Sequence, residues 1–175
     1  MSTPLARPAA DEYAPYYHTY VRLVEDPFRQ LREQPIQLRQ LLASLTDEQS
    51  LLRYAPGKWS IKESLVHMID TERIFAYRAL RIARGDTTAL PGFEQNDYVP
   101  ASGADDRPLS SILTEYDAVR AATLSLLESL RPQDFERRGT ASNNPVSVRA
   151  MAYILAGHEA HHLGILQERY LPLLA

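Results

Sequence analysis

Hydrophobic residues recur every three or four positions along four stretches of the chain, a spacing that is typical of amphipathic α-helices. The first stretch follows Pro27, and the residues on its apolar face are Leu31, Leu38, Leu41, Leu42 and Leu45. Pro35 falls inside this stretch, where proline removes a backbone hydrogen bond and breaks or kinks a helix. We therefore expect a first helix that begins after Pro27 and is disturbed at Pro35.

The next two stretches begin and end at residues that commonly bound helices. The second helix is predicted from Ser60 to Arg84, because Ser60 is a good N-cap and Glu63 stands at the third helical position of a capping box. The third helix is predicted over Pro108–Leu130, with proline in its first turn.

The fourth helix is predicted to begin at Pro145, with Asn144 as its cap, and to continue to about Tyr170. No stretch of the chain shows the alternation of apolar and polar residues that is typical of strands. The predicted fold class is therefore all-α.

A long connection of about 23 residues, 85–107, separates the second and third helices, and it is rich in glycine, proline and aspartate. A four-helix bundle with one long crossover runs up-down-down-up. We therefore expect residues 27–175 to form such a bundle and residues 1–26 to form a partly ordered N-terminal arm. Gln95, Asn96 and Tyr98 are candidates to line a cleft, by their position on this connection alone.

The composition is that of an ordinary globular protein, since 45% of the 175 residues are hydrophobic and 23% are charged. The formal net charge is only -3, so we expect neither nucleic acid nor a membrane as partner. No signal peptide or membrane-spanning run is visible, which predicts a cytoplasmic protein. The absence of cysteine excludes disulfides, thiolate metal ligands and a cysteine nucleophile.

The fourth predicted helix carries three histidines, and two of them suit a metal ion. His158 and His162 are four residues apart, so they share one helix face with Cβ atoms about 5 to 6 Å apart, and His161 lies to the side. Neutral imidazoles at this spacing suit zinc, nickel or iron. Spacing alone leaves a second interpretation equally open, in which the two rings bind neighbouring polar groups of the bundle.

The same segment spells His-Glu-x-x-His, the signature of zinc proteases. The longer metzincin form requires glycine and histidine at the positions that Ile165 and Glu168 occupy here. Such proteases also bind their substrate along the edge of a strand, and no strand is predicted. We therefore expect no activity of this kind, and Glu159 fits a solvated helix surface as well as it fits a general base.

His67 is the histidine of the second predicted helix, and the spacing of apolar residues does not decide whether it is buried or exposed. It lies about 130° from the centre of the apolar face that contains Leu65, Met68 and Phe75. Periodicity alone therefore allows a surface position for His67 or a place in a polar pocket between helices.

Three segments together resemble the DinB/YfiT-like superfamily of metal-dependent enzymes: KWSIKESLVHMIDTE, YDAVRAATLSLLESL and AYILAGHEAHHLGIL. The likeness covers roughly Pro27 to Leu171 and depends on the order and spacing of a tryptophan, Glu63, His67 and two later histidines. It implies the up-down-down-up bundle expected above. It also implies a metal site made of His67, His158 and His162, with His161 as a substitute if the register differs.

Members of this superfamily include thiol S-transferases, isomerases that use small thiols, and hydrolases. Three neutral imidazoles leave a divalent ion its full charge and an open position, where water or a thiol would have its pKa lowered. The resemblance thus implies zinc or nickel, a small-molecule substrate such as a low-molecular-weight thiol, and a homodimer. Glu63, Asp70 and Glu159 are candidates to orient the ligands or act as base, although helix capping or solvation explains them as well.

A second hypothesis comes from another functional class. The bundle would bind a small ligand or a partner without catalysis, and its metal would be structural, adventitious or absent.

Overall fold

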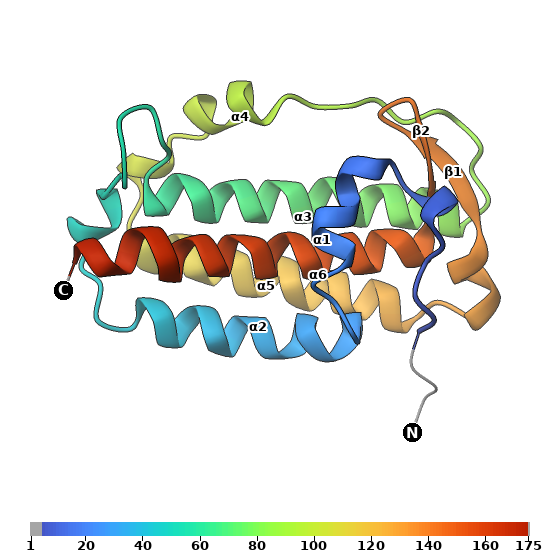
Figure 1. Ribbon diagram of the computed structural model, residues 1–175, viewed down its shortest axis with the longest axis horizontal. Coiled ribbons are helices and arrows are strands. Elements are labelled where there is room, and N and C mark those ends of the chain that lie inside the picture. Colours follow the sequence, from blue (N-terminus) through green and yellow to red (C-terminus); the bar gives the residue numbers. More distant parts are fainter. Residues whose placement is uncertain (1–4, 175) are drawn as a thin grey trace.

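The computed structural model describes residues 5–174, and these form a bundle of four long helices (Figure 1). α3 and α5 run in one direction and α2 and α6 in the other, because the connection between α3 and α5 returns the chain to the end at which α3 begins (Figure 1). The predicted up-down-down-up four-helix bundle is therefore confirmed. The bounds of the helices are α2 Pro27–Leu42, α3 Ile61–Ala83, α5 Leu109–Glu128 and α6 Val148–Ile165.

The start of α3 is the capping box that the sequence predicts. The Ser60 hydroxyl accepts a hydrogen bond from the Glu63 backbone N–H at 3.0 Å, and the Glu63 carboxylate accepts one from the Ser60 N–H at 2.8 Å. Two backbone donors that a helix start leaves unpaired are thereby satisfied.

The first helix is not broken at Pro35, since α2 continues through this residue to Leu42. Proline has no N–H, so the Leu31 carbonyl lacks the helix donor it would otherwise receive from position 35. Arg120 of α5 donates to this carbonyl instead, at 2.8 Å. Tertiary contact thus compensates for the hydrogen bond that proline removes.

The start of the last helix differs from the prediction, because a hairpin lies where Asn144 and Pro145 were expected to begin it. β1 (Arg138–Ala141) pairs antiparallel with β2 (Asn144–Ser147), and Pro145 lies opposite Thr140. The two turn residues between the strands both have positive φ, as in the two-residue turns that match strand twist. α6 begins only afterwards, at Val148, where the Ser147 hydroxyl accepts from the Ala150 N–H at 3.0 Å. The all-α prediction therefore omitted one short two-stranded sheet.

The last helix also ends in a different form from the one expected. α6 is regular to Ile165, and the chain continues as one π-helical turn, Leu166–Tyr170, followed by a 3-10 turn, Leu171–Leu173.

The connection between α3 and α5 passes over the bundle and is attached at both ends (Figure 1). Near its start, the Leu90 N–H donates to the Thr140 carbonyl of β1 at 2.9 Å, and the Leu90 carbonyl accepts from Ser142 at 3.0 Å. Near its end, the Asp105 carboxylate accepts from the Ser60 hydroxyl at 2.5 Å. Between these anchors the connection forms a short helix, α4 (Gln95–Ala101), that the sequence did not indicate.

The segment before α2 packs on α6 over the part that the structure describes. It contains 3-10 turns at Ala10–Glu12 and Pro15–Tyr17 and the single-turn helix α1 (His18–Val21). Val21 and Val24 are buried, and the Arg149 side chain donates to Glu12 at 2.6 Å. The part of the expected arm from Leu5 onward is therefore packed against the bundle, and residues 1–4 of that arm lie outside the described residues.

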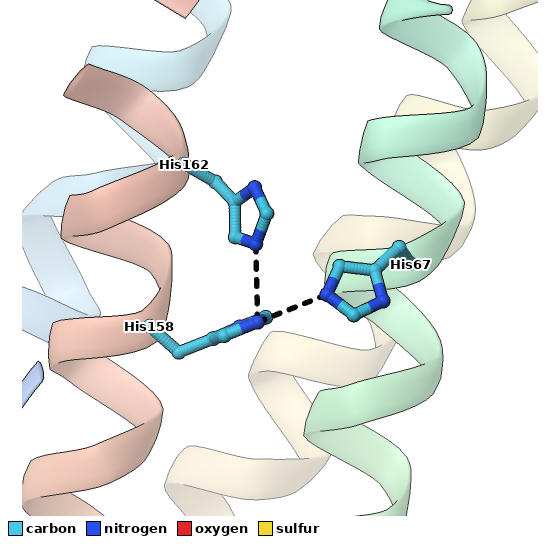
Figure 2. Close-up of side chains that lie close together, drawn as sticks. All are labelled: His67, His158 and His162. Carbon is cyan, nitrogen blue, oxygen red and sulfur yellow. Dashed lines mark hydrogen bonds between the residues drawn. The ribbon is translucent and has the colours of Figure 1, made fainter. Parts of the chain in front are cut away.

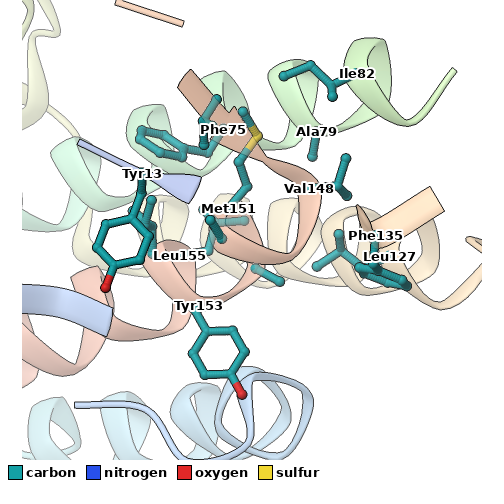
Figure 3. Close-up of a cluster of buried hydrophobic side chains, with 14 of the residues drawn as sticks. Tyr13, Phe75, Ala79, Ile82, Leu127, Phe135, Val148, Met151, Tyr153 and Leu155 are labelled. Atoms are coloured by element: carbon teal, nitrogen blue, oxygen red, sulfur yellow. The ribbon is translucent and has the colours of Figure 1, made fainter. Parts of the chain in front are cut away.

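The hydrophobic core is divided into two clusters along α6. One contains α6 residues up to Ala156 and the labelled side chains of Figure 3, including Phe75, Met151 and Leu155. The other begins on α6 at Leu163 and includes Leu65 and Ile112, among others. A polar layer at residues 158–162 lies between them. Within residues 5–174, no helix has both the length and the hydropathy needed to cross a bilayer.

Candidate metal site

Three histidine side chains converge in the polar layer between α3 and α6 (Figure 2). The Nε2 atom of His158 lies 3.0 Å from Nε2 of His67 and 3.1 Å from Nε2 of His162. All three residues are buried, with 4%, 7% and 8% of the surface exposed for His67, His158 and His162. The side chains that the resemblance singled out are thus brought together by two neighbouring helices.

His67 is inside the bundle because α3 is buried on more than its densest apolar face. The helix packs on both α5 and α6, so the side of α3 that carries His67 faces α6. The Trp59 ring, just before the helix, covers it with ring centroids 4.7 Å apart. Of the two positions that periodicity left open for His67, the structure has the one between helices.

Burial keeps the three imidazoles neutral near pH 7. It lowers the pKa of His67 from 6.5 to about 4. It also holds the pKa of His158 and His162 well below 6.5, with a smaller contribution from the charges that neighbouring imidazoles would carry. Neutral rings have a free nitrogen lone pair, which is the state that binds a metal ion.

The distances between the ring nitrogens also fit one ion. Nitrogens that each lie about 2.0 to 2.1 Å from a zinc ion, at angles near 90 to 110°, are separated by about 2.9 to 3.4 Å. The two separations from His158, 3.0 and 3.1 Å, fall in this range, and all three ligand nitrogens lie within 4.8 Å of one another. A neutral three-nitrogen donor set of this kind suits zinc, nickel or iron.

The predicted carboxylates have contacts elsewhere. Glu63 is occupied in the capping box and in an ion pair with Arg53, and Asp70 lies 3.8 Å from Arg73 at a partly exposed position where burial raises its pKa. Glu159 is buried and accepts from Tyr116 and Arg120. Among the described residues no hydrogen bond joins these carboxylates to the three histidines, so a role as base for any of them stays a prediction.

Sequence reasoning missed the network around Arg120, which is the other half of the polar layer. Arg120 donates to both Glu72 oxygens, at 2.7 to 3.2 Å, and to Glu159. It also reaches the Gln34 side chain at 3.3 Å, and Gln34 in turn donates to the Ala156 carbonyl at 2.7 Å. All four long helices are thereby connected beside the histidines. The signal was present in the sequence, since Glu72 stands in the densest apolar face of its helix.

Two cavities reach the histidines from different sides. A cavity of about 440 Å³ reaches His158, and a smaller one of about 230 Å³ reaches His162 beside Trp59. Asn96 of α4 lines both cavities and Gln95 lines the larger one. Tyr98, the third candidate on the connection, is exposed and packs on Phe93, and it lines neither of the two.

Comparison with known proteins gives a consistent result. The DinB superfamily matches residues 30–166. Proteins named "Putative metal-dependent hydrolase" from Geobacillus thermodenitrificans and Geobacillus kaustophilus are each 27% identical to the chain, over 75% and 79% of both sequences. The structure of YfiT from Bacillus subtilis, titled "a probable metal-dependent hydrolase with an unusual four-helix bundle topology", superposes with a TM-score of 0.74 at 17% identity, covering 96% of this chain and 93% of that one.

Proposed function

Because the chain belongs to the DinB superfamily, we propose that it is a metal-dependent enzyme whose divalent ion, zinc or nickel, is held by His67, His158 and His162. The observation that carries the proposal is the convergence of three buried histidine rings, whose ligand nitrogens lie within 4.8 Å of one another and 3.0 and 3.1 Å apart in two of the three pairs. The names of the Geobacillus relatives support the same class of protein.

The reaction that fits this site is attack by water or by a small thiol on a small molecule. When bound, a divalent ion supplies a positive charge that lowers the pKa of water or a thiol at its open position. Three protein ligands leave such a position, as catalytic sites do. The chain has no cysteine, so a thiol would come from a second small molecule. The proposed activity is thus hydrolysis or thiol S-transfer.

The surrounding residues hold the ligands and limit access of water. Trp59 covers His67. The Tyr20 ring packs edge to face on His158, with the two ring centroids 5.3 Å apart. The Arg120 network binds Glu159, which follows His158 directly on α6, and so fixes the position of that helix against α3 and α5. In this proposal Glu159 is a positioning residue.

The test is the metal content of protein purified without an affinity tag or added metal, measured by elemental analysis. We expect about one zinc or nickel ion per chain in the wild type and little in His162→Ala, because loss of one of three ligands removes most of the affinity. His161→Ala is the matched control, since His161 neighbours the site without belonging to the group, and it should retain the ion. Wild-type protein that holds no metal and does not bind added zinc or nickel at micromolar concentration would contradict the proposal.

A further inference from the structure

We infer that the larger cavity, beside His158, selects a substrate with an aromatic body and a hydrogen-bonding group, and that the Thr71 hydroxyl positions this substrate. The inference rests on the proposed function for the ion that would lie next to the cavity. It concerns the class of substrate, which the histidines themselves do not specify.

Five of the thirteen residues that line the cavity are tyrosine or phenylalanine, and together they form its aromatic wall. The cavity volume of about 440 Å³ lies within the range of small-molecule sites. The rings come from the N-terminal segment, from α3 and from the crossover connection, and they are Tyr16, Tyr17, Tyr20, Phe75 and Phe93. Tyr17 and Phe75 already meet edge to face at 5.7 Å, the geometry in which aromatic groups attract one another. A substrate ring can extend this arrangement.

The aromatic wall is fixed from behind by a buried arginine. The Arg78 guanidinium lies 5.2 Å from the centre of the Phe75 ring and 5.8 Å from that of Phe93. It donates to the Pro91 carbonyl at 2.7 Å and to the Ser142 hydroxyl at 3.1 Å. Phe93 and the adjoining chain are therefore held in place before a substrate enters, which reduces the entropy lost on binding.

Thr71 is one of the polar residues that line the same cavity, beside Glu94, Gln95, Asn96 and Ser142, and it differs from them in lacking a hydrogen-bond partner although it is buried. Thr71 is 5% exposed. Within residues 5–174, its Oγ1 is the one buried side-chain nitrogen or oxygen atom that has no hydrogen-bond partner. A helical threonine commonly donates to the carbonyl four residues earlier, as Thr114 does to Ser110 at 2.9 Å. An unpaired buried hydroxyl destabilises the folded protein, so its retention here requires a reason.

The position of Thr71 supplies that reason. It follows His67 by one helical turn on the same face of α3, so their Cβ atoms are about 5 to 6 Å apart. His158 and Thr71 both line the cavity. A substrate that reaches the ion can therefore form a hydrogen bond with the Thr71 hydroxyl. The oxygen or nitrogen that forms it would lie two or three bonds from the substrate atom nearest the ion.

The experiment compares three thiols that share one metal-binding atom. Cobalt-loaded protein is titrated with ethanethiol, 2-mercaptoethanol and benzyl mercaptan, and binding is followed by the visible absorption of cobalt. We expect the wild type to bind 2-mercaptoethanol about three- to tenfold more tightly than ethanethiol, as one hydrogen bond allows. It should bind benzyl mercaptan at least about tenfold more tightly than ethanethiol.

Two substitutions should remove these preferences separately. Thr71→Val should abolish the preference for 2-mercaptoethanol and keep the preference for benzyl mercaptan. Phe93→Ala should abolish the preference for benzyl mercaptan and keep the preference for 2-mercaptoethanol. Thr71→Ser should restore the first preference. Thr114→Val and Phe28→Ala, which lie outside the cavity, are the matched controls and should change neither ratio.

Thermal stability separates a positioning role from a structural one. Thr71→Val should melt at or above the wild-type temperature, because an unpaired hydroxyl is removed, while the thiol preference is lost. A lower melting temperature with an unchanged preference would overturn the role of Thr71. The absence of a benzyl preference in the wild type, or its survival in Phe93→Ala, would overturn the substrate class.

A measurement on the metal-free protein distinguishes failure of this inference from failure of the proposed function. Saturation-transfer NMR with benzyl alcohol needs no metal ion. Contact with the wild type that is weakened in both Phe93→Ala and Thr71→Val would support the cavity assignment even if the histidines bind no metal. Contact that is absent in the wild type, or unchanged in the variants, would overturn it.

Discussion

Arg120 is the residue on which the buried polar layer depends. Its guanidinium is nearly inaccessible to solvent and is the cation shared by Glu72 and Glu159. It also donates a hydrogen bond to the Leu31 carbonyl, which Pro35 leaves without a donor from the helix. One side chain therefore compensates both for buried carboxylates and for a proline in the middle of α2.

Replacing Arg120 by methionine should be strongly destabilising. The substitution keeps much of the side-chain volume but leaves two buried carboxylates without a cation, a change that typically costs about 3 to 5 kcal/mol. Urea denaturation should show this as a large drop in the free energy of unfolding. Arg39→Ala is the surface control, because its ion pair with Asp117 is about half exposed and should be worth less than about 1 kcal/mol. Equal effects of the two substitutions would contradict the importance given to the buried network.

The sequence identifies the histidines more readily than their surroundings. The four-residue spacing of His158 and His162 places both on one helix face without knowledge of the fold. The burial of His67 could not be derived in this way, since it depends on which helices pack against α3. The partners of Arg120 come from three other helices, so only tertiary structure brings them together.

At the level of elements, Gly157 determines how closely α1 approaches α6. A Cβ atom at this position would lie 2.2 Å from the Tyr20 carbonyl oxygen, which is far inside any allowed contact. Tyr20 is also the residue whose ring packs on His158. The glycine before the ligand thus permits the N-terminal segment to cover the site.

Gly157→Ala should therefore displace α1 and lower stability by about 1 to 3 kcal/mol, as overpacking commonly does. Gly164→Ala, on the same helix, has nothing within 4 Å of its added Cβ and should be neutral or stabilising by up to about 1 kcal/mol. Melting temperatures and the rate of limited proteolysis before residue 27 would report both effects. Similar behaviour of the two variants would show that the close approach is not important.

The N-terminal segment should also make stability depend on pH. Burial on its own raises the pKa of Glu12, but hydrogen bonds from Arg149 and Ser147 outweigh it and bring the pKa from 4.5 to about 2. Folded Glu12 then binds a proton less readily than the unfolded chain does. Its contribution, at most about 3 kcal/mol, is complete above pH 4.5 and is lost as pH falls to about 2.

The check is the free energy of unfolding of the wild type and Glu12→Gln between pH 2 and pH 6. The two curves should lie apart above pH 4.5 and converge toward pH 2. A constant separation across this range would mean that Glu12 does not titrate in this way.

Local sequence signals predicted some element boundaries and missed others. The capping box at Ser60 is a short-range interaction, so the start of α3 could be predicted correctly. The hairpin before α6 was missed because Asn144 and Pro145 suit a helix start as well as a turn and an edge strand. α4 has no strong helix signal and contains Pro100, but the Glu94 side chain caps it by accepting from the Asn96 N–H, and its Val99 is buried, which only the tertiary structure shows.

At the level of the whole molecule, a bound ion would join α3 and α6, because the three histidines come from these two helices. An ion that binds only the folded state raises stability, by about 2.7 kcal/mol at a hundred times its dissociation constant. Adding zinc or nickel should therefore raise the melting temperature of the wild type. His67→Ala should show little increase. An equal increase in both proteins, followed by differential scanning fluorimetry, would place metal binding elsewhere on the molecule.

The attachment of the crossover at Leu90 and at Asp105 has a consequence for evolution. Because both ends are fixed, the exposed positions between them can change at little cost to the bundle, whereas Val99 and Ala104 are buried. The histidines lie outside this stretch, on α3 and α6. Through Phe93 this stretch carries one part of the proposed substrate selection, whereas Thr71 and Phe75, which carry another part, lie on α3 with His67. Exchange of residues 91–104 between relatives should then alter one wall of the cavity while it leaves His67, His158 and His162 in place.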